Sequence, residues 1–573
     1  MKASKFVRFL KNGLFLVLVV SLVLVLSCVG YTQQEVKAIR HTNSWPCYLD
    51  PAVGSDYASS IALCNLYDSL VFPNPDGSVK PLLAKSWEIS GDGLTYIFEL
   101  VPGIKFHSGN ELTAEDVVFS LERIMTIGEG YGYLFTANIE GAKILDKYKV
   151  QFNLKKTFGP FLGALVRLYI LDKNQVMANI QDGLYGEFGD YGKGWLVTHD
   201  AGSGPYKVKE MKTEEYLLME KFNDYWAGWE NKDAPQCERN DYWAGWENKD
   251  APQYVKEIGT TEAVTIRTLM KRGELEITDQ WQTSENLAAI DQIPNTEVSS
   301  LFEGSVLNIM LNTKKPPTDD IHFRKALAYC IDYQQIIDKI FPGSRPSGPI
   351  ASSTPGYNPD LKPCVLDLVK AEEELKQSPY YENLDQYPFE LYWVSEVPDE
   401  EKVALMIQAN AAKLGIKVNI VKVPWLSLID VLAKTETTPT GAIIFVSPHY
   451  AEAGSMLESR YHSRSCGTWE QGEWLQDPEI DAMIEDAITS IDQKERFQKY
   501  HAVQEKIAEL SPTLWILEQA VKQAYRSDYI VFPAEEDVKQ GKLCNPVMGY
   551  NFYYRDFKVF PEKAQKPYTP FKP

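Results

Sequence analysis

Aromatic side chains recur at the ends of predicted strands, where they could stack on a bound solute. Four of them lie at or just beyond such ends: Trp281, Trp393, Trp425 and Tyr450. In an α/β lobe the carboxyl ends of the strands face the ligand cleft, and flat rings there pack against apolar side chains or sugar faces. The pattern predicts an aromatic-lined binding pocket. Three further candidate contacts lie in or beside loops: Trp45, Tyr133 and Gln282.

Residues for catalysis or metal binding do not form a comparable pattern. The sequence has no HExxH, GxSxG or EF-hand motif. Gly186 to Gly194 lacks the Ser or Thr that a phosphate loop requires after Lys193. No Cys and His spacing indicates zinc. We therefore expect no enzyme, no catalytic residue, no metal site and no cofactor.

The elements that must position the aromatic residues alternate along the second half of the chain. The predicted order is strand Phe389–Val394, helix Lys402–Leu414, strand Lys417–Val423, helix Leu426–Ala433 and strand Ala442–Val446. This alternation predicts an α/β fold with a mostly parallel sheet. Because a single hydrophobic core stops growing near about 250 to 300 residues, the 573-residue chain predicts two large lobes.

The N-terminus has the layout of a secretory signal. Lys2, Lys5, Arg8 and Lys11 precede an apolar run from Leu14 to Leu26. The run ends at Val25-Leu26-Ser27-Cys28, which resembles a bacterial lipobox, so residues 1–27 are expected to be removed and Cys28 to be lipidated. The departures at Val25 and Leu26 leave ordinary signal cleavage or an uncleaved anchor as alternatives. Lipid chains would anchor the protein to a membrane outside the cytoplasm.

Net charge and cysteine content narrow the class of protein further. Loss of residues 1–27 removes four positive charges and no negative one, which takes the net charge from −20 to −24. An acidic chain argues against nucleic acid as a partner. Besides Cys28 and Cys237, six cysteines remain that could form up to three disulfides, with fifteen possible pairings.

Residues 81–124 contain the most specific pattern. A Gly-Asp-Gly turn leads into alternating apolar residues from Leu94 to Leu100, as in a strand that leaves a hairpin. Thr113 and Asp116 have the spacing of a capping box at the start of a helix. Val117, Val118, Leu121, Ile124 and Met125 form the apolar stripe of that helix.

The order SWE, DGLTYIFEL, GIKFHSG, LTAEDVVFSLERI is similar to the signature of the family 5 extracellular solute-binding proteins, the substrate-binding components of ABC importers. The resemblance implies a two-lobe, type II periplasmic-binding-protein-like clamp, with an extra subdomain and two crossing hinge strands. Residues 28–70, 201–310 and 525–573 would form lobe I, 71–200 the extra subdomain and 311–524 lobe II. It also implies a monomer that delivers its solute to membrane permease subunits.

The resemblance implies that the loop Ser447-Pro448-His449-Tyr450 determines which class of ligand is bound. In peptide-binding members an Asp in this loop pairs with the free α-amino group of the peptide. Alignment puts His449 at that place, although a shift of a few residues would make Glu452 the anion. We therefore include Pro448, His449 and Tyr450 among the ligand contacts, and His449→Asp is expected to strengthen binding of peptides with free amino termini.

A duplication interrupts the first half of the chain. Residues 223–236 and 240–253 are the same fourteen residues, NDYWAGWENKDAPQ, at an offset of seventeen. The family pattern expects one copy, so we interpret residues 223–253 as a tandem duplication in a surface loop, whose closure cost grows slowly with length. Two adjacent aromatic platforms for a ligand are the alternative.

Three functions remain open from the sequence. Oligopeptide import is the commonest role in the family. Oligosaccharide import is favoured by the tryptophans and by the missing Asp. A lipoprotein that senses or scaffolds without delivering a solute is the hypothesis from a different class.

Overall fold

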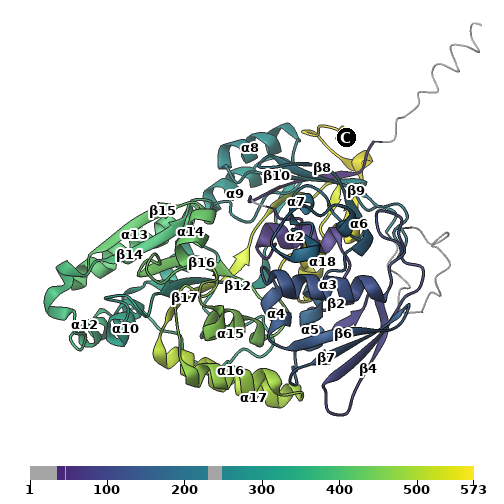
Figure 1. The fold of residues 1–573 in the computed structure, drawn as a ribbon. Coiled ribbons are helices and arrows are strands. Elements are labelled where there is room, and N and C mark those ends of the chain that lie inside the picture. The colour runs from purple at the N-terminus through teal and green to yellow at the C-terminus, as the bar shows by residue number, and fades with distance from the viewer. Residues whose placement is uncertain (1–34, 46, 230–247) are drawn as a thin grey trace, which may run out of the picture.

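The computed structural model describes residues 35–45, 47–229 and 248–573 (Figure 1). The proposed signal peptide, Cys28, Cys237 and the middle of the duplication lie outside these residues. Within the described residues no helix is long and apolar enough to cross a membrane.

The signature region forms a small antiparallel sheet with one helix. Strands β4 (Ala84–Ile89), β5 (Thr95–Leu100), β6 (Ile139–Asp146) and β7 (Lys149–Leu154) pair in the order β4-β5-β7-β6. Helix α3 (Ala114–Ile127) begins at the predicted capping box of Thr113 and Asp116. Val117, Leu121 and Ile124 of its apolar stripe are buried. The strand, cap and helix predicted here are confirmed.

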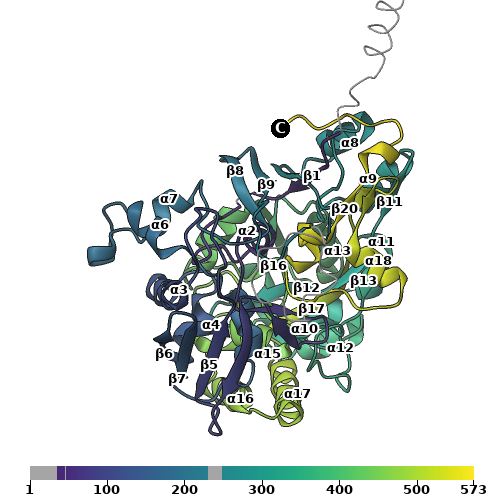
Figure 2. The same cartoon turned by 90° about the vertical axis from the view of Figure 1, so that its right-hand side faces the viewer.

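A second sheet lies at the other end of the same half of the molecule (Figure 2). Its strands are β1 (Ala38–Asn43), β8 (Tyr206–Lys212), β9 (Tyr216–Lys221) and β10 (Tyr254–Gly259), in the order β1-β10-β9-β8. Ile277 adds single β-bridges to His41 and Tyr525. Helices α2 (Tyr57–Leu66) and α8 (Ala263–Arg272) also belong to this part.

The third sheet contains the crossing strands. Its order is β13-β17-β12-β16-β14-β15, with β12 (Leu301–Leu311), β13 (Gly343–Ser344), β14 (Phe389–Val394), β15 (Val418–Val423), β16 (Gly441–Val446) and β17 (Thr513–Val521). Strand β14 is parallel to β15 and β16, but β12 is antiparallel to β16 and β17, and β13 to β17. The prediction of a mostly parallel sheet is therefore wrong, because three of the five strand pairings, those made by β12 and β13, are antiparallel.

Helices of the second half pack beside this sheet and against the signature region. Helices α13 (Asp399–Ala411) and α14 (Trp425–Leu432) follow β14 and β15, close to their predicted places. The helices of this half also include α16 (Pro478–Thr489) and α17 (Gln493–Leu510), which are preceded by α15 (Ala453–Tyr461). Thr157 Oγ1 donates to Thr489 O over 2.7 Å and Gly159 N to Ile488 O over 2.7 Å, so α16 contacts the loop before α5 (Phe161–Ala164).

The remaining elements are short and connect or cover the three sheets. They are β2 (Val71–Pro73), β3 (Val79–Pro81), α4 (Gly132–Thr136), α6 (Lys173–Ala178), α7 (Lys193–Leu196), α9 (Ser284–Asp291), β11 (Thr296–Val298), α10 (Ile321–Cys330), α11 (Tyr333–Lys339), α12 (Leu368–Leu375), β18 (Ala524–Arg526), β19 (Ile530–Val531), α18 (Pro533–Lys539) and β20 (Lys558–Val559). The C-terminal segment returns to α2, where Asn65 Nδ2 donates to Phe552 O and Tyr554 N donates to Asn65 Oδ1, each over 2.8 Å.

The six described cysteines are all free thiols, so none of the fifteen pairings occurs in this structure: Cys47, Cys64, Cys330, Cys364, Cys466 and Cys544. Apart from Cys330, these thiols lie near oxygen atoms. Cys64 Sγ, for example, is 3.3 Å from Ile61 O, and Cys466 Sγ is 3.3 Å from Gln471 Oε1.

Candidate ligand cavity

A cavity lies where the first half of the molecule, the third sheet and the crossing strands β12 and β17 meet. From the first half it is lined by Ser44, Trp45, Asp56, Tyr57, Gln280, Trp281 and Met548. From the second half it is lined by Val394, Glu396, Val397, Glu400, Trp425, Ile444, Phe445, Ser447 and Trp469. The crossing strands also contribute: Ser305 lies on β12, and Gln519 and Val521 lie on β17. Such a position suits a solute held between two lobes.

The rings on the first side are set by the ends of short elements. Trp45 follows β1, and a Cβ atom at Gly259 would come within 2.9 Å of its ring, so Gly259 leaves the space that Trp45 occupies. Tyr57 is the first residue of α2, directly after Asp56, which caps that helix by accepting from Ser59 N. The backbone N–H of Trp281 donates to Asp279 over 2.9 Å. The ring centroids of Trp281 and Phe445, which both line the cavity, are 5.4 Å apart.

On the second side, Trp425 begins α14 and its backbone N–H donates to the Glu396 carboxylate over 3.2 Å. Trp469 comes from the loop between α15 and α16. Its ring meets that of Trp425 edge to face, with centroids 5.3 Å apart and planes at 71°. The cavity therefore has a corner made of two indoles from different segments.

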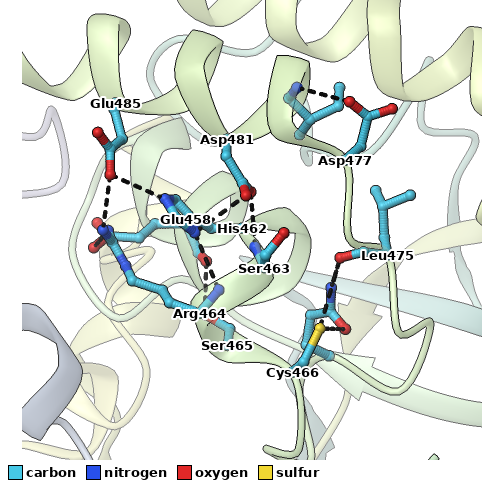
Figure 3. A network of polar contacts seen from close by, with 12 residues as sticks. Glu458, His462, Ser463, Arg464, Ser465, Cys466, Leu475, Asp477, Asp481 and Glu485 are labelled. Carbon is cyan, nitrogen blue, oxygen red and sulfur yellow. Dashed lines mark hydrogen bonds and ion pairs between the residues drawn. The ribbon is translucent and has the colours of Figure 1, made fainter.

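A polar network holds the loop that carries Trp469 (Figure 3). At its start Ser463 N donates to Asp481 over 2.8 Å, and His462 lies 3.3 Å from Glu485. Arg464 pairs with Glu458 on α15. Further along, Cys466 and Gln471 close the loop on Leu475 O, with Gln471 Nε2 at 2.9 Å. These contacts connect the loop to α15 and α16 and so define the position of the Trp469 ring.

Gln280 is a buried polar side chain of the cavity wall. It is 4% exposed, and neither its amide oxygen nor its amide nitrogen has a hydrogen-bond partner among the described residues. A buried amide without partners costs free energy. It can donate to one group of a ligand and accept from another, so its place in the wall favours a solute with amide or hydroxyl groups.

Buried carboxyl groups surround the first side of the cavity. Tyr57 donates its hydroxyl to Glu303 Oε2 over 3.1 Å, and burial raises the pKa of Glu303 to about 7. Behind Trp281, burial raises the pKa of Asp279 to about 6. The environment of the cavity is therefore acidic and poorly solvated.

Of the nine ligand contacts expected from the sequence, the structure places three in the cavity wall: Trp45, Trp281 and Trp425. Gln282 is next to the wall but its amide is used inside the protein. Its Nε2 donates to Asp279 over 2.9 Å and its Oε1 accepts from Asn286 over 2.6 Å. Trp393 is 2% exposed and faces the other side of the sheet, with Lys422 Nζ 5.2 Å from its ring centroid.

The loop after β16 turns away from the cavity after Ser447. His449 is 1% exposed, with Nδ1 2.6 Å from the Tyr133 hydroxyl and Nε2 3.2 Å from Glu470 Oε1. Burial, with a further contribution from Arg167, lowers the pKa of His449 to about 3, so its imidazole is neutral. Tyr133 and His449 thus join two parts of the protein behind the cavity, and neither lines it.

Pro448 and Tyr450 are the remaining expected contacts, and both pack within the protein. Pro448 lies over Gly304, where a Cβ atom would come within 3.0 Å of its ring, and Pro448 O accepts from Met548 N. Tyr450 is 1% exposed beside Gly454 of α15. The alternative anion, Glu452, is also buried and is paired with Arg496 over 2.7 Å.

Several lining residues were not expected from the sequence: Tyr57, Gln280, Glu396, Glu400 and Trp469. Glu396 and Glu400 directly follow β14, at the strand end where Trp393 was chosen. Gln280 precedes the predicted Trp281. The strand-end rule could have found these three had it been extended by a few residues, whereas no periodic pattern marks Trp469.

The fold and the cavity define a two-lobe solute-binding protein. The family model "Bacterial extracellular solute-binding proteins, family 5 Middle" matches residues 78–438, and the chain belongs to this family. It is accordingly the solute-binding component of an ABC importer and not an enzyme, and it acts outside the cytoplasm.

Similar proteins bind different solutes. The chain is 26% identical over 493 residues to the probable D,D-dipeptide-binding periplasmic protein DdpA of Escherichia coli, covering 84% of this chain and 88% of that protein. It is 25% identical to heme-binding protein A of Haemophilus influenzae, covering 82% and 84%. The fold is similar to that of the periplasmic binding protein DppA from Helicobacter pylori in complex with the peptide STSA, with a TM-score of 0.75, 23% identity and coverage of 93% and 99%.

Proposed function

We propose that this protein captures a short peptide in the cavity between its lobes and delivers it to the permease of its importer. The observation that carries this proposal is the buried Gln280 amide, whose oxygen and nitrogen both lack partners among the described residues. A peptide group offers one donor and one acceptor and can pair with both. The dipeptide-binding relatives support the same ligand class.

In this proposal Trp45, Trp281 and Trp425 contact the side chains of the peptide. Residues 28–70, 201–310 and 525–573 form the first lobe with the subdomain 71–200, and residues 311–524 form the second. The two lobes close about the crossing strands β12 and β17. The protein acts as a monomer that is attached to the membrane through lipidated Cys28.

Oligosaccharide import is the second candidate, because four tryptophans line the cavity: Trp45, Trp281, Trp425 and Trp469. Indole faces stack on sugar rings as well as on apolar side chains. The third hypothesis, a lipoprotein that senses or scaffolds without delivering a solute, gains no support from an aromatic-lined cavity between the two halves.

Native mass spectrometry of the full-length protein, purified from its membrane without refolding, tests the proposal. A ladder of masses spaced by amino-acid residues is expected. A ladder spaced by hexose units would contradict the peptide and support the second candidate, and the absence of any solute after extraction and after incubation with peptide mixtures would contradict both.

The lipid anchor is tested separately. Labelling cells with a radioactive fatty acid should label the wild-type protein, whereas the Cys28→Ser variant should carry no label and should leave the membrane fraction. Labelling of the variant at wild-type level would contradict the anchor.

A further inference from the structure

The charges in the cavity wall all have the same sign. Asp56 lies on the first side and Glu396 and Glu400 on the second, and among the described residues no Lys, Arg or His lines the cavity. The three carboxyl groups therefore lie in the wall on both sides, where each also accepts a hydrogen bond within the protein, Asp56 from Ser59, Glu396 from Trp425 and Glu400 from Val394. An acidic, enclosed wall raises the local concentration of cations and disfavours anions.

The layer behind the wall does not reverse this charge. Glu303 stands behind Tyr57 and Asp279 behind Trp281. Arg167 contacts the lining residue Met548 through the backbone. It donates to Met548 O over 2.9 Å and to His449 O over 2.7 Å. Arg167 is fully buried, so its guanidinium is separated from a solute by the backbone it binds.

Six rings line the same space: Trp45, Tyr57, Trp281, Trp425, Phe445 and Trp469. They include two contacting pairs, Trp425 with Trp469 and Trp281 with Phe445. A positively charged nitrogen over the face of such rings is attracted by the negative charge of the ring face, most strongly when the site is desolvated. Rings combined with carboxylates make a site that suits an ammonium group.

A carboxylate inside this cavity would have no cationic partner. Moving an ion from water to a poorly solvated site is costly unless it is paired. Glu400 shows this effect: it is 1% exposed, and burial and the neighbouring Glu396 raise its pKa well above the usual range, which favours its neutral form. A bound cation would favour the ionised carboxylate, whereas a second anion would oppose it.

We propose that the cavity selects solutes that bring a positively charged nitrogen into it and no free carboxylate. The proposal deepens the proposed function and rests on it: for a peptide, the ammonium terminus or a basic side chain occupies the cavity and the C-terminal carboxylate is capped or stays outside. Gln280 then pairs with a neutral amide of the same solute.

Three tripeptides with identical side chains test this selection by calorimetry on the full-length protein in detergent. They are free tri-alanine, its C-terminal amide and N-acetyl-tri-alanine with a free carboxylate. The amide should bind at least about tenfold more tightly than free tri-alanine, which corresponds to about 1.4 kcal/mol, and the acetylated peptide should bind worst. Equal or tighter binding of the acetylated peptide would overturn the selection while leaving peptide import intact.

Spermidine separates this inference from the proposed function. Binding of spermidine without binding of any tripeptide supports a cation site and contradicts peptide import. If neither spermidine nor the tripeptide amide binds, the inference is overturned, even if the protein retains a neutral sugar.

A charge variant and its control localise the effect. Glu396→Gln should reduce the preference for the amide over free tri-alanine by about tenfold, because it removes one charge while its amide oxygen still accepts from Trp425 N. Glu401→Gln changes an exposed residue of α13 next to Glu400 and should retain the wild-type preference. Glu400→Gln provides a second variant if Glu396→Gln does not fold. An unchanged preference in a folded variant of either residue would contradict the proposal.

Discussion

The indole of Trp469 meets the indole of Trp425 edge to face, with ring centroids 5.3 Å apart, although 44 positions separate the two residues. Trp425 begins a helix at the end of a strand, and Trp469 enters from a loop that is bound to α15 and α16. Each ring limits the position of the other, so the pair presents one fixed aromatic corner to a solute.

Trp469→Ala is therefore expected to weaken binding of the retained solute by about tenfold or more, the loss of one buried aromatic contact. Trp469→Phe should recover part of the affinity. Calorimetric titration of both variants checks this, and Trp195→Ala, which changes a tryptophan outside the cavity, is the control. An Ala variant that binds as the wild type does would exclude the ring from the site.

The two aromatic residues also show how far sequence reasoning reaches. Trp425 could be predicted because it follows a strand whose apolar pattern is clear, and strand ends in α/β lobes face the cleft. Trp469 could not, because its place depends on ion pairs such as Arg464 with Glu458, and these pairs depend on the packing of α15 against α16. The family, the two-lobe fold and the bounds of the helices and strands between residues 389 and 446 were predictable from local pattern and resemblance.

The directions of side chains were harder to predict from the sequence than the positions of the strands. Trp393 ends a correctly predicted strand but points to the opposite face of the sheet, because successive strand residues alternate between faces. Gln282 was expected in the site and Gln280 was not, although they are two positions apart in one loop. The partners that decide between them, Asp279 and Asn286, become visible only in the folded chain.

These two glutamines should respond in opposite ways to the same substitution. Gln280→Leu should weaken binding of peptide amides by about tenfold and leave the free energy of unfolding unchanged or raised by about 1 kcal/mol, because it removes a buried amide without protein partners. Gln282→Leu should leave affinity unchanged but lower the free energy of unfolding by about 1 to 3 kcal/mol, because Asp279 and Asn286 lose a partner. Urea unfolding and calorimetry on both variants measure the two effects.

If each variant showed the affinity and stability effects expected of the other, the roles assigned to Gln280 and Gln282 would be contradicted. If Gln280→Leu lost stability and kept its affinity, the amide would have a structural partner and no role in the cavity. The two variants serve as controls for each other, since they make the same chemical change in the same loop.

The structure changes the result that is expected for the His449→Asp variant. His449 is buried between Tyr133 and Glu470, outside the cavity wall. An aspartate there would place a carboxylate beside Glu470 and should lower the free energy of unfolding by about 3 kcal/mol or more. It should not create binding of peptides with free amino termini.

Tyr133→Phe is the matched control, since it removes only the hydroxyl that contacts His449 and should cost about 1 kcal/mol. Chemical denaturation gives both values, and calorimetry at a temperature where the variants are folded gives the affinity. A His449→Asp protein of wild-type stability that gains affinity for free peptides would restore the first expectation.

Glu303 should make stability depend on pH. Burial raises the pKa of its carboxyl to about 7. The unfolded state loses this proton near pH 4.5 and the folded state near 7, so the folded state holds more protons in between. The stabilisation by this group falls as the pH rises through that window, by about 2 to 3 kcal/mol in total.

Glu303→Gln removes the proton and keeps an oxygen that can accept from Tyr57. Relative to the wild type, the variant should therefore gain about 2 to 3 kcal/mol of unfolding free energy between pH 5 and pH 8. Comparing the two proteins cancels the opposite trend from His449, whose lowered pKa favours the folded state at higher pH. Glu140→Gln, on an exposed strand position, should show no such gain. Parallel wild-type and Glu303→Gln curves would contradict the raised pKa.

The duplicated segment leads to a deletion whose ends the structure defines. The described residues include 223–229 from the first copy and 248–253 from the second, which together give one unit, NDYWAGW and NKDAPQ, apart from its glutamate. Trp226 Nε1 donates to the buried Asp68 over 2.9 Å. The two flanks meet at Arg555, which donates to Gly228 O over 3.0 Å and accepts at its own carbonyl from Asn248 Nδ2 over 2.8 Å.

Deletion of residues 230–246 would join Trp229 to Glu247 and restore a single NDYWAGWENKDAPQ. Because it keeps both flanks with their contacts to Asp68 and Arg555, the deletion should leave solute affinity unchanged and the free energy of unfolding equal or slightly higher, since a shorter loop costs less entropy to close. Deletion of the seventeen residues 223–239 leaves the same amino-acid sequence and is no separate control. The matched control is Asn248→Ala in the shortened protein, which removes the bonds to Arg555 O and Phe557 O and should lower stability by about 1 to 3 kcal/mol. A tenfold loss of affinity on deletion would instead give the second copy a part in binding.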